Sequence, residues 1–323
     1  MTSHPPRQPD GPPLMARQQE ALLALLLSLK ANGYEFVTPT PATHARVIAR
    51  RDQAKDIRDV LGWSLPFSWD LLDPAIRDLL VAGGALQPVG ALYRSNVRVS
   101  SLKGHLFLHS AYPTVEETAV FFGPDSYRFA DLIERELASH RGRGGMRICD
   151  MGTGSGVGAI IAGALSPGDA RIMASDINPR AIGFARINAA AAGMAVDLRL
   201  GADMAGIEDA CDLILMNPPY IIDPDGRLYR DGGTNAGAGV TLAMAGAAID
   251  RLAPDGRLIV YSGSAIIAGA DHLFQALARL CEASGCTLHY RELDPDVFGE
   301  ELATPHYAKV ERIAVVAARI TRR

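Results

Sequence analysis

Lysine is scarce in this chain of 323 residues, and charge of a single sign is scarce as well. Only four of the 32 basic residues are lysine, and the formal net charge is -4. Residues 1–149 hold 17 basic and 15 acidic side chains, whereas residues 150–323 hold 15 and 21. Because a strong nucleic-acid binder usually carries a basic field over its binding face, this balance argues against nucleic acid as the main partner.

Cysteine and long apolar runs are also few. The four cysteines form no C-x-x-C pair, which favours free thiols in a reducing compartment and predicts a cytoplasmic protein. The apolar stretch 21–29 is shorter than the roughly 20 residues of a membrane-spanning helix, and no small-residue cleavage site accompanies it. His105 and His109 have ligand-like spacing but no third ligand nearby. We therefore predict no membrane span, no signal peptide and no metal site.

The chain divides into three parts by composition and rhythm. Residues 1–13 hold five prolines and predict a disordered tail. Residues 14–120 predict a smaller, mostly helical accessory domain that recognises substrate, and residues 121–323 predict the catalytic domain. The accessory domain has helical patterns at about 15–31, 42–61 and 73–82, and a β-hairpin within 92–109.

The catalytic part alternates strand and helix patterns. Strands are expected at 147–151, 171–176, 197–200, 212–216, 257–262, 287–292 and 312–318, with the last two antiparallel. Helices are expected at 156–165, 179–192, 241–252 and 272–284. This alternation predicts an α/β fold with a Rossmann-like, seven-stranded, doubly wound sheet, which binds ligands beyond the carboxyl ends of its strands.

A glycine-rich loop, Asp150-Met151-Gly152-Thr153-Gly154-Ser155-Gly156, follows the first of these strands. Glycines let the backbone approach a ligand closely, and the next helix offers free N–H groups to an anionic group. Asp176 ends the second strand, where a carboxylate can accept both hydroxyls of a ribose. Gly154, Gly156 and Ala159 also satisfy the G-x-G-x-x-A pattern of a nicotinamide-dependent dehydrogenase, so the loop alone leaves two cofactors open.

The sequence Asn217-Pro218-Pro219-Tyr220 follows the fourth strand and favours methyl transfer. Two prolines end the strand and leave the Asn217 side chain and the Pro218 carbonyl as acceptors in the crevice. Two acceptors that hold the hydrogens of a planar –NH2 group would aim its lone pair at a sulfonium methyl, with Tyr220 stacked on the planar group. A dehydrogenase has no use for this arrangement, so we predict S-adenosyl-L-methionine as the cofactor and an amide or amine nitrogen as the acceptor.

Asp150–Gly156, Asp176 and Asn217–Tyr220 together resemble the signature of the class I S-adenosylmethionine-dependent methyltransferases. The chain looks most like the branch of release-factor glutamine methyltransferases (HemK/PrmC-like), also called the methyltransferase small domain. That resemblance implies a helical N-terminal domain and a hairpin before the catalytic domain, with a protein glutamine as acceptor. Residues 121–127 resemble the family's proline-centred loop at the cofactor pocket, but read Gly-Pro-Asp-Ser-Tyr where the family usually shows Pro-Arg-Pro-Glu-Thr.

These patterns define the expected site. The expected cofactor-binding residues are Asp150, Gly152, Thr153, Gly154, Gly156, Asp176, Ile177, Asp203, Asn217 and Tyr127, and the expected catalytic residues are Asn217, Pro218 and Tyr220. Asp203 would read the adenine amine, and the glycine-rich stretch 223–239 is either a mobile lid or a plain connection.

The identity of the methyl acceptor stays open at this point. A protein glutamine or a small-molecule metabolite is the predicted acceptor, a nucleic-acid base is the alternative within the same chemistry, and a non-catalytic binding module is the alternative from another class. We expect a monomer or a homodimer.

Overall fold

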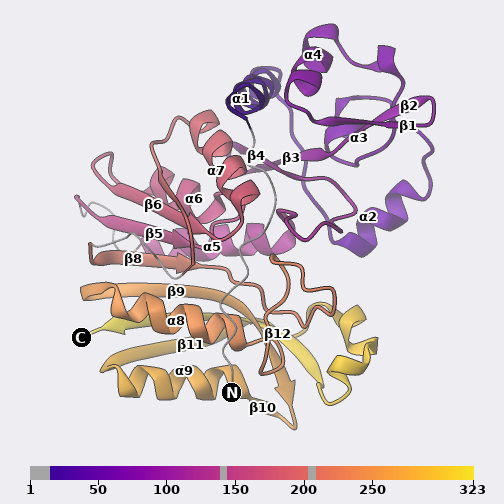
Figure 1. Ribbon diagram of the computed structural model, residues 1–323. Coiled ribbons are helices and arrows are strands. Elements are labelled where there is room, and N and C mark those ends of the chain that lie inside the picture. The colour runs from indigo at the N-terminus through magenta and orange to yellow at the C-terminus, as the bar shows by residue number, and fades with distance from the viewer. Residues whose placement is uncertain (1–14, 139–143, 203–208) are drawn as a thin grey trace.

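The computed structural model describes residues 15–138, 144–202 and 209–323, and Figure 1 shows their arrangement. The tail predicted at 1–13 lies outside the described residues. A central sheet is built from the later part of the chain, and the N-terminal helices and hairpins pack on one side of it.

The central sheet has the predicted doubly wound arrangement. Its main strands are β5 (Arg147–Met151), β6 (Arg171–Asp176), β7 (Asp197–Leu200), β8 (Cys211–Met216), β9 (Leu252–Ile267), β11 (Cys286–Asp294) and β12 (Arg312–Arg322). They follow the order β11-β12-β9-β8-β5-β6-β7, and the short β10 (Ala270–Asp271) pairs with β9. β12 is antiparallel to β9 and β11, whereas the other neighbours along this order are parallel. The predicted α/β fold is thus confirmed, with its last two strands antiparallel.

Helices cover both faces of the sheet. They are α5 (Pro124–Ala138), α6 (Val157–Leu165), α7 (Pro179–Ala191), α8 (Gly239–Asp250) and α9 (His272–Ala283). Apolar side chains of α5 and α6 share one buried cluster with the sheet, and those of α8 and α9 share another. Figure 1 shows α8 and α9 on the side of the molecule away from the N-terminal helices.

The direction in which strands are added reverses next to β5. From β5 the chain adds β6 and β7 on one side, then returns to add β8 and β9 on the other. At such a reversal the connections leave β5 and β8 toward opposite faces, which opens a crevice beyond their carboxyl ends. The glycine loop and the Asn-Pro-Pro-Tyr turn follow these two strands, so the topology brings them together.

The N-terminal part is less helical than its pattern predicts. It contains α1 (Ala16–Ala31), α2 (Pro41–Ile48), α3 (Ile57–Leu61), η1 (Trp69–Leu71), α4 (Pro74–Ala82), β1 (Leu86–Val89), β2 (Leu92–Ser95), β3 (Val97–Leu102) and β4 (His105–Ser110). The helix predicted across 42–61 is wrong in extent, because Asp56 has an extended backbone and its side chain accepts from the backbone N–H of Asp59, which starts α3. Two hairpins form where one was predicted, β1–β2 and β3–β4, and the expected Lys103-Gly104 turn joins the second.

Helix α7 packs between the N-terminal part and the sheet. Leucines of α1 and apolar residues of β3 and β4 pack against its Phe184 and Ile187. The buried amide of Asn188 accepts from the Leu108 N–H at 2.8 Å and donates to the carbonyl oxygens of Leu108 and Ser155 at 3.0 and 2.8 Å. One side chain therefore ties strand β4 to the glycine loop. The domain boundary at residue 120 stays a prediction.

Among the residues that the structure describes, no helix combines the length and the apolar character needed to cross a bilayer.

Candidate active site

A cavity of about 610 Å³ opens beyond the carboxyl ends of β5, β6 and β8. Its wall includes the glycine loop, residues 175–178 and the turn at 217–221. It also includes residues 112–115 and 119–121, the first turn of α5, and residues 227–230. The predicted cofactor loop and the predicted catalytic turn thus face one common space, at the position where the topology opens the sheet.

The three glycines of the loop have different surroundings. Gly152 and Gly154 line the cavity with φ of +72° and +55°, and a Cβ added to Gly154 would meet no heavy atom within 4 Å. The backbone at Gly154 is therefore open to a ligand. Gly156, with φ of +88°, is outside the wall, and a Cβ there would lie 3.4 Å from Ala185 of α7. Its role in this structure is close packing of the loop on a helix, as the third glycine of such loops provides.

Asp150 holds the loop together from within. Its side chain is 1% exposed, and Oδ2 accepts from the Thr153 hydroxyl at 2.5 Å and from the Ala159 N–H at 2.9 Å. Burial raises the pKa of Asp150 to about 6, although these hydrogen bonds lower it. The carboxylate joins the loop to the first turn of α6, and it also lines the cavity.

Asp176 lines the cavity and is joined to the glycine loop. Its Oδ2 accepts from the Gly154 N–H and its Oδ1 from the Asn178 N–H, each at 2.9 Å. Burial raises the pKa of Asp176. A carboxylate offers about four acceptor positions, so these two hydrogen bonds leave acceptor capacity for a ribose hydroxyl. Ile177 lies beside it in the wall.

Asn217, Pro218 and Tyr220 also line the cavity, and the Tyr220 ring is tightly held. A Cβ added to Gly263 would lie 2.3 Å from its Cδ2, and Phe298 meets the ring edge with centroids 5.9 Å apart. The Tyr220 hydroxyl donates to Asp125 Oδ2 at 2.7 Å. Burial first, and the nearby Asp125 carboxylate second, raise the pKa of Tyr220 well above its ordinary value. The phenol therefore stays protonated and fixed.

Besides Gly156, two more predicted cofactor residues do not join this group. Tyr127 is outside the cavity wall, and its hydroxyl accepts from the Thr38 N–H at 2.9 Å while its ring meets Phe122 edge-on. The structure thus directs Tyr127 to the N-terminal part, and its neighbours Asp125 and Ser126 line the cavity in its place. Asp203 lies outside the described residues.

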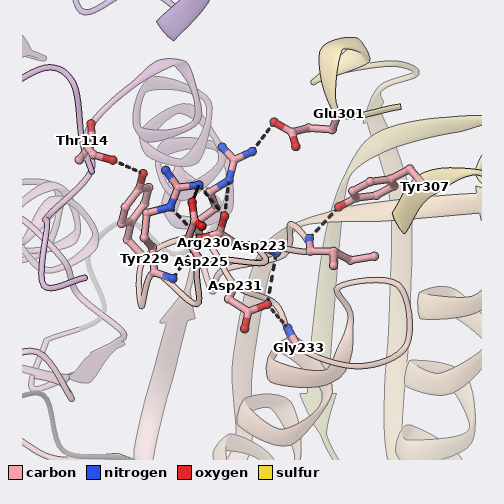
Figure 2. Close-up of polar contacts among 11 residues, drawn as sticks. Thr114, Asp223, Asp225, Tyr229, Arg230, Asp231, Gly233, Glu301 and Tyr307 are labelled. Atoms are coloured by element: carbon pink, nitrogen blue, oxygen red, sulfur yellow. Dashed lines mark hydrogen bonds and ion pairs between the residues drawn. The ribbon is translucent and has the colours of Figure 1, made fainter. Parts of the chain in front are cut away.

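The glycine-rich stretch that follows the catalytic turn is anchored on several sides, and Figure 2 shows these contacts. Asp223 is buried and accepts from Arg227 Nε at 2.7 Å, and Arg230 pairs with Asp223 and with Glu301. Tyr229 donates its hydroxyl to the Thr114 carbonyl at 3.0 Å. Both arginines at the cavity mouth are therefore neutralised by carboxylates.

The residues of the wall fit S-adenosylmethionine. The space beside Gly154, next to the start of α6, leaves room for the methionine part of the cofactor. The carboxylate of Asp176 suits the ribose, and the volume of about 610 Å³ lies in the range of small-molecule sites, roughly 300–1,000 Å³.

A doubly wound sheet with this loop, this carboxylate and this Asn-Pro-Pro-Tyr turn at its switch point is the arrangement expected of a class I S-adenosylmethionine-dependent methyltransferase. Residues 130–283 match the family model of the methyltransferase small domain. This match and the relatives described below agree with the predicted family, enzyme class and cofactor.

Curated relatives and solved structures add the following similarities. The chain is 36% identical over 153 residues to the release factor glutamine methyltransferase of Cereibacter sphaeroides, covering 43% of this chain and 51% of that protein. It is 30% identical over 159 residues to the enzyme of the same name from Deinococcus radiodurans, covering 48% and 55%. The chain thus spans about half the length of the curated relatives it matches. Trm5b from Pyrococcus abyssi superposes with a TM-score of 0.48 at 17% identity, covering 76% of this chain and 68% of that one.

Proposed function

We propose that this protein transfers the methyl group of S-adenosylmethionine to the side-chain amide nitrogen of a glutamine in a protein. The observation that supports this most strongly is the shared cavity, in which the Asn217-Pro218-Pro219-Tyr220 turn faces the same space as Gly152, Gly154 and Asp176. When bound, the cofactor supplies an electrophilic methyl group on a sulfonium centre.

An amide nitrogen is a poor nucleophile, and the turn can hold it in a reactive orientation. The lone pair of an amide is delocalised into the carbonyl, so the nitrogen attacks only if its geometry is altered and held. The Asn217 side-chain oxygen and the Pro218 carbonyl accept the two hydrogens of the –NH2 group and direct its lone pair toward the methyl group. Orientation and fixed dipoles then carry the catalysis, and the proton leaves to solvent after transfer.

The mouth of the cavity favours a neutral acceptor. Tyr112, Pro113, Val115, Phe121 and Phe298 give it aromatic and aliphatic sides. The basic side chains of the described wall are arginines 227 and 230, and both are paired with carboxylates. A phosphate-bearing acceptor would need unpaired basic groups there, so the observations favour protein over nucleic acid.

The names of the relatives agree with a protein acceptor, because the two relatives compared above are release factor glutamine methyltransferases. We further propose that residues up to about 120 contribute to acceptor recognition, since Pro41 and Tyr112 reach the cavity wall.

The test combines cofactor binding with turnover. Calorimetric titration with S-adenosylhomocysteine should give micromolar binding, and NAD in parallel should give none. Asn217→Ala should abolish methyl transfer to a release factor while the affinity for S-adenosylhomocysteine stays within a few-fold, because Asn217 holds the acceptor. Asn32→Ala, at the exposed end of α1, is the matched control and should retain turnover. Normal turnover by Asn217→Ala, or binding of NAD instead, would contradict the proposal.

A further inference from the structure

A buried carboxylate in the cavity wall has no part in the chemistry described so far. Asp125 lies in the first turn of α5 and is 6% exposed. Its Oδ2 accepts from the Tyr220 hydroxyl and its Oδ1 from the Tyr261 hydroxyl, each at 2.7 Å. Tyr220 follows β8 and Tyr261 lies on β9, so one side chain joins a helix to the region of two adjacent strands.

The two tyrosines differ in what they touch. Asp125 and Tyr220 both line the cavity, whereas Tyr261 is fully buried and outside the wall. The two hydrogen bonds are equal in length and end on the same carboxylate. The Tyr261–Asp125 hydrogen bond can therefore have only a structural role, whereas the Tyr220–Asp125 hydrogen bond involves a residue of the cavity wall.

A carboxylate is a costly choice of acceptor at this position. Burying a charged group costs more than burying a neutral one, unless opposite charge compensates it fully. Arg128 is the partner, but its Nη1 lies 3.5 Å from Asp125, its side chain is 40% exposed, and it is shared with Asp294 at 3.1 Å. Only an ionised carboxyl group, however, offers acceptors to two hydroxyl donors at once without presenting a donor of its own.

We propose that Asp125 is a positioning residue of the methyl-transfer reaction, which acts by fixing the hydroxyl, and hence the ring angle, of Tyr220 on the acceptor side of the cavity. This inference rests on the proposed function. In the reaction, the C–S bond of the sulfonium breaks with its electron pair remaining on sulfur, and the acceptor nitrogen forms the new N–C bond with its lone pair. The positive charge moves to that nitrogen, which then releases a proton to solvent.

The Tyr220 ring is well placed to control this step. Gly263 packs closely against the ring, Phe298 meets it edge-on, and the hydrogen bond to Asp125 holds the hydroxyl end. Near-attack geometry is sensitive to such a tilt, since a displacement of about 1 Å can cost up to about a hundredfold in rate.

The kinetic test compares Asp125→Asn, Tyr220→Phe and Tyr261→Phe, with the double variant Asp125→Asn/Tyr220→Phe. We expect Asp125→Asn and Tyr220→Phe each to lower kcat by about tenfold or more, with KM for S-adenosylmethionine within about threefold. The double variant should be no slower than Tyr220→Phe alone, because both changes remove one interaction. Tyr261→Phe, the matched control, should lower kcat by no more than about threefold.

A structural role alone would give a different pattern. If Tyr261→Phe and Tyr220→Phe lowered kcat equally, or if kcat fell only in proportion to the loss of Tm, the proposal would be overturned. Normal kcat in Asp125→Asn would overturn it as well.

A second measurement does not depend on turnover. In protein labelled with 13C at tyrosine Cζ, the Tyr220 resonance, assigned by its absence in Tyr220→Phe, should shift in Asp125→Asn. If the wild-type protein fails to methylate any protein glutamine, the proposed function fails while this spectrum still decides the role of Asp125. An unchanged Tyr220 resonance in Asp125→Asn would overturn the inference by itself.

Discussion

Replacing Gly154 by alanine should change two measurable quantities for different reasons: the affinity for the ligand and the stability of the folded protein. Gly154 has φ of +55° and lines the cavity, and an added methyl group would meet no protein atom within 4 Å. The folded protein thus has room for the methyl group, and its stability should fall only by the cost of a left-handed alanine, about 1–2 kcal/mol. The bound ligand should lack that room, so affinity for S-adenosylhomocysteine should fall at least tenfold, or about 1.4 kcal/mol.

Gly285→Ala is the matched control for this prediction. Gly285 follows α9 with φ of +65°, also has no heavy atom near an added Cβ, and lies outside the cavity wall. Denaturant titration should show a similar loss of stability in both variants, and calorimetry should show weaker ligand binding in Gly154→Ala alone. Equal affinity in the two variants would refute the idea that the cofactor lies on the Gly154 backbone.

Three further predictions follow from the same contacts. Asp176→Ala should weaken S-adenosylhomocysteine binding by about 1.5–3 kcal/mol, the scale of a hydrogen bond to a charged group, and an unchanged calorimetric Kd would contradict its ribose role. Because burial raises the pKa of Asp150 from 3.8 to about 6, the native state loses stability as pH rises between these values. The free energy of unfolding of Asp150→Asn, relative to that of the wild type, should therefore rise by up to about 3 kcal/mol from pH 4 to pH 7 in denaturant titrations. If the difference in free energy of unfolding between the two proteins did not change with pH, the raised pKa would be refuted. Gly263→Ala should displace the Tyr220 ring and lower kcat more than cofactor affinity, whereas Gly246→Ala on α8, which meets no atom, should not.

Local patterns predicted the catalytic half of the chain well. The bounds of β5, β6 and β7 agree with the expected ranges because short runs that contain aliphatic residues end there at glycine or aspartate. The full strand order was not predicted, but a glycine loop and an Asn-Pro-Pro-Tyr turn that share one site are consistent with β5 and β8 as neighbours.

The orientation of single side chains could not be predicted from the sequence in this way. Tyr127 belongs to the proline-centred segment expected at the cofactor pocket, but α5 begins at Pro124 and turns by about 100° per residue, so Asp125 and Ser126 face the cavity instead. The Asp125 cluster joins residues 95 and 136 positions apart, and its only signal was an acidic residue in that segment. The Asp56 cap was missed because residues 42–61 were predicted as one helical segment, within which Asp56 starts a separate helix.

The most direct test of the account is mass spectrometry of a release factor from the same organism after incubation with this protein and isotope-labelled S-adenosylmethionine. We expect one added methyl group on the side-chain amide of a glutamine, present with the wild-type protein and absent with Asn217→Ala. Labelling of a different residue, or an unlabelled release factor while nucleic acid in the same extract becomes methylated, would contradict it.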